Sequence, residues 1–372
     1  MKILHIITAL GDGGAEHTLY KICKYDNENE HVVISLKGPG KYYSLLKKLG
    51  IKVYYLNIKF YSINKFFTLT SLINSLKPNI VQTWLIHADL IGGVAAKIIG
   101  IKNIIWNVRY TNIVLGKSKI TSVFIVKILS YLSFFIPNSI IVVSKKAKKI
   151  YGTEGYDKKK FVYIPNGYDF SILKSDQSQR KNFRKKFKVN KKTLLIGNVA
   201  RYDPKKDHAN LLKALALLKL KNRDFLCILV GTNINKSNSE LTSLIKELKL
   251  SHKIKLLGKK NNISQIMNGI DIYIQSSSYG EGFPNVVAEA MSCGTPCIVT
   301  NVGDASHIVG KNGWVVPPNN EVKLARTIDS ISDKIGSKKW NMISEDARMK
   351  IKDKFSIKKM ISSYNKLWFK FR

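Results

Sequence analysis

Apolar and polar positions divide this sequence into many short segments. Apolar runs of about four to six residues alternate with longer stretches in which apolar residues recur at helical spacing. Such runs are typical of strands buried on both faces of a parallel sheet, and the stretches between them are typical of crossover helices. We therefore expect an α/β protein. The predicted strands cover residues 2–8, 31–35, 52–56, 80–83, 103–107, 139–143, 161–164, 193–199, 225–230, 254–257, 270–275 and 296–300.

The length of the chain indicates more than one domain, because 372 residues exceed what one hydrophobic core usually supports. A turn signal at residues 165–167 opens a polar, lysine-rich segment with weak patterning, which we predict to be a linker over residues 166–192. We expect a first domain over 1–165 and a second over 193–355. Residues 356–372 have the pattern of an amphipathic helix, which we expect to cover an apolar surface, with the first domain as the candidate.

The chain is strongly basic, with a formal charge of +37 from 62 basic and 25 acidic side chains. Residues 1–192 hold 33 basic and 10 acidic side chains, and residues 193–372 hold 29 and 15. This excess would attract nucleic acid, nucleotide substrates or an acidic membrane leaflet, and by itself it selects none of them. The functional interpretation is a basic face for a membrane-bound acceptor. The alternative is that lysines solvate the surface of a lysine-rich chain.

Cysteines and long apolar stretches argue against several classes of protein. The four cysteines are too few and too scattered for a disulfide framework, and we expect small buried thiols in a reducing compartment. The first ten residues could pass for a secretory leader, but they lack a cleavage motif and we expect a buried strand. Lys127, Pro137 and Asn138 interrupt the longest apolar stretch, residues 121–143, and argue against a membrane span.

The most informative stretch is residues 276–302. A predicted strand ends near Gln275, a glycine-rich loop follows, and a helix begins near Pro284, where a first-turn proline loses no hydrogen bond. Gly294 ends that helix before the next strand. A helix N-terminus at the carboxyl end of a parallel strand offers free amides and a partial positive charge, which suits a diphosphate.

Two acidic and two basic residues add chemistry to this stretch. Glu281 lies on the loop, where it can reach a bound sugar, and Glu289 lies just over one turn into the helix, where it can accept hydrogen bonds from ribose hydroxyls. Arg201 and Lys206 follow an earlier strand; arginine offers a planar fork to phosphate oxygens and lysine offers a point charge. In so basic a chain that pair alone is weak evidence, but joined to the glutamates it indicates a nucleotide-diphosphate site.

The spacing within Glu-Gly-Phe-Pro-Asn-Val-Val-Ala-Glu-Ala resembles the glutamate-seven-residue-glutamate motif of glycosyltransferase family 4, a retaining family with the GT-B fold. Residues 198–208 resemble the diphosphate loop of that family. The resemblance covers essentially the whole chain and implies two Rossmann-like domains whose parallel sheets face a central cleft. It implies that Arg201 and Lys206 hold the diphosphate, Glu289 the ribose and Glu281 the donor sugar. The implied donor-binding residues are Gly13, Gly14, Arg201, Lys206, Glu281, Gly282, Phe283, Pro284 and Glu289.

The resemblance extends to the first domain. Gly13 and Gly14 match a glycine loop whose backbone approaches the donor phosphates in the family, although a glycine cluster after a strand is common in any Rossmann-like domain. Residues 84–89 and 106–109 look like a bacterial subgroup acting on polysaccharide precursors. Many members carry a histidine after the fifth strand, where this chain has Tyr110 preceded by Arg109, and these two are acceptor-side candidates. His87 is a substitute catalytic candidate beside Arg201, Lys206 and Glu281, although a lone histidine is more often structural.

The absence of any Asp-x-Asp triplet from the sequence removes the carboxylate pair with which other transferases bind a divalent metal. We therefore expect a metal-independent enzyme in which cationic side chains and helix N-termini stabilise the departing diphosphate. The expected reaction moves a hexose or N-acetylhexosamine from a nucleotide-diphosphate sugar to a hydroxyl group, with retained configuration as the family implies. A UDP-sugar is the favoured donor, and no separate cofactor is expected.

We expect the acceptor to be a lipid-linked saccharide in surface polysaccharide synthesis of the O-antigen or capsule type. The enzyme would then be cytoplasmic and peripheral on the anionic cytoplasmic face of a bacterial inner membrane. One alternative is a sugar-nucleotide epimerase, because that chemistry occurs on the same architecture. Another is a basic nucleic-acid-binding protein, although the sequence has no recognisable reading helix, zinc spacing or aromatic RNA motif.

Overall fold

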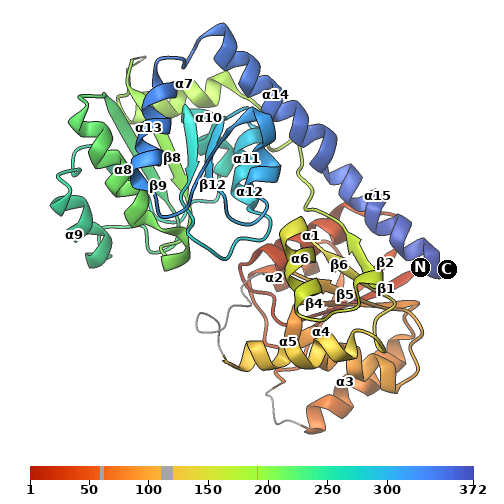
Figure 1. Cartoon of the computed structure of the whole chain (residues 1–372). Helices are drawn as coiled ribbons and strands as arrows, with labels where there is room; N and C mark the ends of the chain where they lie inside the picture. Colours follow the sequence, from red (N-terminus) through yellow and green to blue (C-terminus); the bar gives the residue numbers. More distant parts are fainter. Residues whose placement is uncertain (59–62, 110–119, 191) are drawn as a thin grey trace. The chain divides into compact units, whose positions relative to one another are not determined.

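The computed structural model describes residues 1–58, 63–109, 120–190 and 192–372. Their contacts divide the chain into two compact units, each of which contains one parallel sheet (Figure 1). Unit one comprises Met1–Gly167 and Ile357–Arg372, and unit two comprises Tyr168–Ser356. The α/β prediction and the prediction of two Rossmann-like, parallel-sheet halves are confirmed.

Unit one contains a seven-stranded parallel sheet with the order β3-β2-β1-β4-β5-β6-β7. Its strands are β1 Lys2–Ile7, β2 Glu30–Ser35, β3 Lys52–Tyr55, β4 Ile80–Trp84, β5 Ile104–Val108, β6 Ser139–Val142 and β7 Phe161–Tyr163. Its helices are α1 Gly14–Tyr25, α2 Lys41–Lys48, α3 Ile63–Leu76, α4 Ile86–Ile98, α5 Ile120–Leu132, α6 Lys145–Thr153 and α15 Ile357–Trp368, with 3₁₀ turns η1 Lys158–Lys160 and η4 Phe369–Phe371.

Both faces of this sheet are buried, which explains why its strands read as nearly continuous apolar runs. In β1, Leu4 and Ile6 pack with residues of α3, α4 and α5, whereas Ile3 and Ile7 pack with residues of α1, α2 and α15. Helix α15 reaches this second core cluster because its buried residues follow helical spacing. Those residues are Ile357, Met360, Ile361, Tyr364, Asn365, Leu367 and Trp368.

Unit two contains a six-stranded parallel sheet with the order β10-β9-β8-β11-β12-β13. Its strands are β8 Leu194–Val199, β9 Phe225–Val230, β10 Ile254–Leu256, β11 Ile272–Gln275, β12 Cys297–Thr300 and β13 Trp314–Val316. Its helices are α7 Gln177–Lys186, α8 His208–Leu220, α9 Ser239–Glu247, α10 Ile263–Gly269, α11 Asn285–Ser292, α12 Ala305–Val309, α13 Glu321–Ser332 and α14 Lys338–Phe355, with 3₁₀ turns η2 Pro204–Lys206 and η3 Gly310–Asn312.

Every predicted strand is present, with its ends shifted by at most two residues. The segment expected to be a linker, residues 166–192, differs from the prediction because it contains helix α7. That helix packs on α10 through Phe183, its one buried residue, and belongs to unit two. The four cysteines are buried free thiols, as predicted. None of the described helices is both long and apolar enough to cross a membrane.

Candidate functional site

The loop after β8 is held by aspartate side chains that cap its turns. Asp203 accepts a hydrogen bond from the backbone amide of Lys205 and begins η2, in which Pro204 takes the first position. Asp207 then adopts a left-handed conformation, with φ 48°, and caps α8 by accepting from the amide of Asn210. These caps fix the backbone on both sides of Lys206.

A second loop, after β11, lies against the first. The amide of Ser278 donates to the carbonyl of Lys205 at 2.9 Å, and the Ser276 hydroxyl donates to the carbonyl of Lys206 at 2.8 Å. Two loops at the carboxyl edge of the same sheet are therefore joined by hydrogen bonds to backbone carbonyls of the first loop, which brings Lys206 to the acidic side chain on the second loop.

Lys206 and Glu281 form an ion pair across the two loops. Lys206 Nζ lies 2.5 Å from Glu281 Oε1, which also accepts from the Ser277 hydroxyl at 2.6 Å. Burial alone would raise the pKa of Glu281, but the Lys206 charge and hydrogen bonds from Lys206, Ser277 and Gln275 hold that pKa below its usual range. Glu281 is therefore an ionised, largely buried carboxylate that orients a lysine.

A cavity of about 210 Å³ opens beside this ion pair, at the carboxyl ends of β8 and β11. Its walls include Lys206, Glu281, Phe283 and Pro284 from the predicted donor-binding residues; Asn198, Tyr273, Gln275, Ser277 and Asn285 were not predicted. Among the described residues, nothing hydrogen-bonds Asn198 Oδ1 or Gln275 Oε1, although both atoms are buried. Buried polar atoms are normally paired, so the cavity offers hydrogen-bonding capacity to a polar ligand.

The remaining predicted donor residues are not part of the cavity wall. Arg201 is 62% exposed, and its Nε donates to Asp203 at 3.0 Å. Glu289 is half-buried on α11, where its charge raises the pKa values of Tyr273 and Cys293 in addition to the larger effect of burial. The Gly282 carbonyl accepts a hydrogen bond from the amide of Asp304 at 2.8 Å. Their predicted contacts with the diphosphate, ribose and sugar stay predictions.

Two glycines that the sequence did not single out make the loop arrangement sterically possible. A Cβ at Gly231 would lie 2.0 Å from the carbonyl oxygen of Ala200, and one at Gly303 would lie 2.5 Å from that of Glu281. Both glycines have positive φ angles, 154° and 63°. Gly231 directly follows β9 and Gly303 lies three residues after β12. A glycine just after a predicted strand is the sequence signal that could have drawn attention to them.

In unit one, Arg109 is surrounded by polar partners. Its Nε donates to Asn107, its Nη1 to Thr18 and Asn166, and its Nη2 to the Tyr364 hydroxyl, with distances from 2.7 to 3.2 Å. The guanidinium also lies over the Trp84 ring, 5.0 Å from its centre. These contacts join β5, α1, the end of β4 and α15. Arg109 thus has a structural role in unit one, while its predicted contact with an acceptor stays a prediction; Tyr110 lies outside the described residues.

His87 lies half-buried in the first turn of α4. Burial, followed by the positive charge of Lys37, lowers the pKa of His87, so the imidazole is neutral at pH 7. The residue that precedes the helix, Leu85, has φ 73° and ψ 152°, a conformation that non-glycine residues rarely adopt. Strain of this kind clusters at functional sites, which favours a functional role for this edge of the sheet.

The predicted glycine loop begins α1. Gly13 precedes the helix and Gly14 is its first residue. A Cβ at Gly13 would lie 2.4 Å from Glu16 Oε2, so the absence of a side chain at Gly13 lets the Glu16 carboxylate lie against the start of its own helix. Burial raises the pKa of Glu16, partly offset by hydrogen bonding to its backbone and by the Arg109 charge.

A buried cluster in unit one brings His5, His31 and Cys23 close enough to surround an ion. The hydrogen bonds of the two histidines determine which ring nitrogens carry protons, and this assignment does not suit a metal. The Trp84 indole can only donate, so His5 Nδ1 accepts at 3.2 Å; His5 Nε2 then donates to His31 Nδ1, and His31 Nε2 donates to Asp26. A metal on His5 Nε2 would displace this proton and leave both ring nitrogens without hydrogen. The cluster is therefore a structural hydrogen-bond chain.

Comparison with known proteins relates the chain to glycosyltransferases. Residues 179–350, which lie within unit two, match the family model described as glycosyl transferases group 1. The chain is 28% identical over 152 residues to the putative glycosyltransferase EpsF of Bacillus subtilis, covering 41% of this chain and 39% of that protein. The chain thus spans well under half the length of that relative.

A longer alignment, 25% identical over 312 residues, relates the chain to the Escherichia coli UDP-Gal:alpha-D-GlcNAc-diphosphoundecaprenol alpha-1,3-galactosyltransferase. It covers 81% of this chain and 78% of that enzyme. Among solved structures, Anabaena HepE in complex with UDP matches with a TM-score of 0.88 at 22% identity, covering 99% of each chain. These comparisons support a glycosyltransferase, and the structural match shows the GT-B fold.

Proposed function

We propose that this chain transfers a sugar from a nucleotide-diphosphate sugar to a hydroxyl acceptor and that the unit-two cavity receives the donor. The Lys206–Glu281 ion pair carries this proposal, because it places a cation beside a polar cavity at the carboxyl edge of a parallel sheet. Ligands of α/β proteins bind at this edge. The match to glycosyl transferases group 1 supports the same activity.

In the proposed reaction, Lys206 neutralises charge that develops on the departing diphosphate, and Glu281 holds that lysine in position while contacting the donor sugar. Arg201 adds a second cation once its exposed side chain turns to the phosphates. Glu289 binds the ribose, as the family resemblance implies. The reaction retains the anomeric configuration through front-face attack, in which a donor phosphate oxygen takes the acceptor proton. No metal takes part in this scheme, because the two cations supply the positive charge.

A UDP-sugar carrying a hexose or N-acetylhexosamine is the proposed donor. HepE was crystallised with UDP, and the Escherichia coli relative is named for a UDP-Gal donor. Thermal melting with UDP, GDP and ADP tests the base, because a ligand that binds only the folded state raises the melting temperature. UDP should give the largest shift. A larger shift with GDP or ADP would contradict the choice of base.

The acceptor proposed is a lipid-linked saccharide, the class named for the Escherichia coli relative, and the product belongs to surface polysaccharide synthesis. Incubating UDP-glucose, UDP-galactose and their N-acetylated forms with and without a diphosphoundecaprenol-linked sugar tests this. A transferase forms product only with the acceptor, whereas an epimerase interconverts donors without it. Conversion of donor alone, at the same rate with and without acceptor, would favour the epimerase.

An exposed apolar surface on unit one supports a position at the cytoplasmic face of a membrane. Along and just after α5, large apolar side chains are exposed; they are Ile120, Phe124, Tyr131, Phe134 and Phe135. Lysines are abundant in the following helix α6, at residues 145, 146, 148 and 149. Exposed aromatic residues and lysines are the residue types that suit an anionic lipid surface.

Co-sedimentation with vesicles tests this position. The protein should pellet with vesicles that contain phosphatidylglycerol at low salt, and less with pure phosphatidylcholine or at 1 M salt, where charge is screened within about 3 Å. Phe124→Ser with Phe135→Ser should weaken pelleting. Equal recovery on both vesicle types at low salt would contradict an anionic partner, and salt-dependent retention on DNA without nucleotide-sugar binding would favour the nucleic-acid alternative.

A further inference from the structure

Unit two contains a second cavity at the opposite edge of its sheet. It has a volume of about 600 Å³, and Asp271 and Pro296, which immediately precede β11 and β12, form part of its wall. The donor cavity lies beyond the ends of β8 and β11, so the two cavities are separated by the length of the strands. A volume of this size lies within the range of small-molecule sites.

The balance of acidic and basic side chains around this second cavity differs from that of the whole chain. The protein has 62 basic and 25 acidic side chains, yet the cavity wall contains no lysine and has three carboxylates, Asp176, Asp271 and Glu345, against two arginines. Both arginines are already engaged. Arg180 pairs with Asp271 and donates to the carbonyl of Ile270, and Arg348 donates to the carbonyls of Leu173 and Ser292. Arg348 has no carboxylate partner among these contacts, but Asp176 and Glu345 outnumber it at the wall, which disfavours a phosphate or nucleotide.

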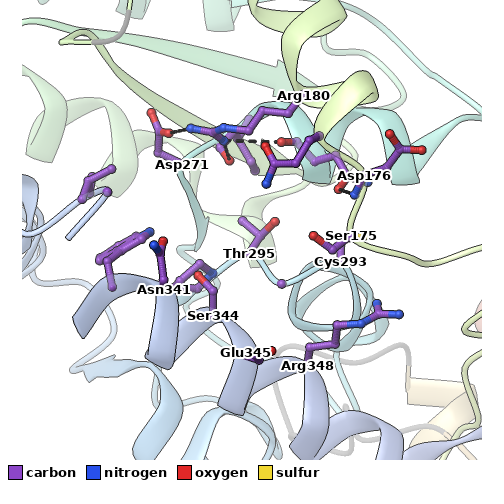
Figure 2. A pocket seen from close by; sticks show the side chains of 18 residues that line it. Ser175, Asp176, Arg180, Asp271, Cys293, Thr295, Asn341, Ser344, Glu345 and Arg348 are labelled. Atoms are coloured by element: carbon purple, nitrogen blue, oxygen red, sulfur yellow. Dashed lines mark hydrogen bonds and ion pairs between the residues drawn. The ribbon is translucent and has the colours of Figure 1, made fainter. Parts of the chain in front are cut away.

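Helix α14 supplies the opposite wall with neutral and acidic polar groups. Figure 2 shows Asn341 and Ser344 on the side of α14 that faces Asp271 and Thr295. Glu345 and Arg348 also line the cavity, so the lining positions recur at helical spacing. Among the described residues, none hydrogen-bonds the side chain of Asn341, Ser344 or Glu345. An amide, a hydroxyl and a carboxylate thus remain available to a ligand.

Apolar surface completes the wall. The buried Trp340, which stacks on Trp314 with ring centres 5.7 Å apart, contributes to the lining together with Ile335. Ligand sites commonly combine apolar surface with a few polar groups that fix orientation. Hydroxyl groups both donate and accept hydrogen bonds, so a ligand rich in hydroxyls can satisfy an amide, a hydroxyl and a carboxylate at once.

From these features we infer that this cavity binds an uncharged saccharide, at a site separate from the donor cavity. The absence of lysine and the excess of carboxylates over arginines disfavour anions, and the neutral polar groups beside the apolar wall favour sugar hydroxyls and ring carbons. The inference does not depend on the proposed transfer reaction, because it concerns a different edge of the sheet and a different ligand class.

Saturation-transfer NMR and calorimetry with maltotriose and with N,N′,N″-triacetylchitotriose test this inference on the full chain. At least one should bind the native protein. Ser344→Trp, which fills the cavity, should weaken that binding tenfold or more. Met342→Trp is the matched control, because Met342 is 64% exposed on the same helix and does not line the cavity; its saccharide binding should equal that of the native protein.

Three outcomes would overturn the inference. They are absence of binding by both oligosaccharides, equal binding by native protein and a folded Ser344→Trp variant, and displacement of the saccharide by UDP, which would place it in the donor cavity. If Ser344→Trp melts early, Asn341→Ala replaces it and should also weaken binding. The melting shift caused by UDP should be the same in all variants, so loss of that shift would count against the donor site and leave the saccharide site unaffected.

Discussion

The carboxyl edges of the two sheets have the same architecture but use their polar residues differently. In unit one, Arg109 contacts side chains from three other segments of that unit, and all three of its guanidinium nitrogens donate hydrogen bonds to described residues. In unit two, the Lys206–Glu281 pair borders a cavity in which buried amide oxygens have no described partner. A polar cluster that satisfies itself stabilises a fold, whereas one that leaves atoms unpaired beside a cavity can bind a ligand.

The largest effect that would test this contrast is on turnover. Lys206→Ala should lower turnover about 100- to 1,000-fold, because it removes a preorganised cation from the developing charge. Lys205→Ala, the matched control, removes a neighbouring charge that does not line the cavity and should change turnover by about threefold at most, as for surface substitutions. Steady-state kinetics with the donor that melting identifies provides the measurement. Equal losses in both variants would contradict the assignment of Lys206.

Loss of Lys206 also leaves the Glu281 carboxylate buried without its partner, which can destabilise the protein independently of catalysis. The double variant Lys206→Met with Glu281→Gln separates the two effects. It should melt near the native temperature and remain inactive. A double variant with native activity would show that the ion pair only supports the loops.

The second effect distinguishes the two arginines. Arg109→Ala should lower the free energy of unfolding by about 2–4 kcal/mol, because several buried polar groups lose a charged partner. Arg201→Ala should leave it within about 0.5 kcal/mol, because the side chain is 62% exposed, and should lower turnover about ten- to hundredfold. Urea unfolding and kinetics measure both. An Arg109→Ala variant with native stability and lost turnover would make Arg109 a substrate contact.

Acid should affect unit one more than unit two. Burial lowers the pKa of His5 well below 6.5, that of His17 to about 3, and that of His208, in unit two, to about 4. Below about pH 6.5 the unfolded chain therefore binds more protons than the folded chain. The free energy of unfolding falls from there by about 1.4 kcal/mol per pH unit for each histidine, until the folded pKa is reached.

Hydrogen exchange at pH 7 and pH 4.5 measures this difference. His87, whose pKa burial also lowers, brings the number of such histidines in unit one to three. Burial raises the pKa of Asp89 to about 7, so the folded chain binds this proton more tightly and Asp89 offsets one of the three. The remaining two against one in unit two predict that unit one loses amide protection first. Earlier loss of protection in β8, β9 and β11 would contradict the prediction.

The smallest effect concerns the support of the donor cavity. The Tyr168 hydroxyl donates to Asn285 Oδ1 at 2.7 Å, and its ring stacks on Phe283, which lines the cavity. Tyr168→Phe should lower the stability of unit two by about 1 kcal/mol, the contribution of one hydrogen bond. Tyr131→Phe, at a position 68% exposed in unit one, is the control and should have no measurable effect. Chemical denaturation monitored for each unit measures the loss of stability. An equal loss in both variants would exclude this role for Tyr168.

Periodicity predicted the strands well because both sheet faces are buried and the runs are unbroken. It missed β13, a three-residue strand, and α7, in which Phe183 is the only buried side chain among many charged residues. The sequence singled out Lys206 and Glu281, which the structure brings into contact. It could not show that they pair across 75 positions, because that contact depends on backbone hydrogen bonds between two loops. The roles of Gly231 and Gly303 likewise depend on which backbone passes beside them.

The chain passes between its units twice, at Gly167–Tyr168 and at Ser356–Ile357. On the ribosome, residues 1–167 emerge first, yet α15, which contributes Met360, Tyr364 and Trp368 to their core, emerges only after all of unit two. Domains usually fold in the order of synthesis. Here unit one cannot complete its core until α15 is synthesised, so part of its sheet face stays uncovered. Unit two consists of one continuous segment and can fold before unit one is complete. Chaperone protection therefore matters most for unit one in the period before α15 is synthesised.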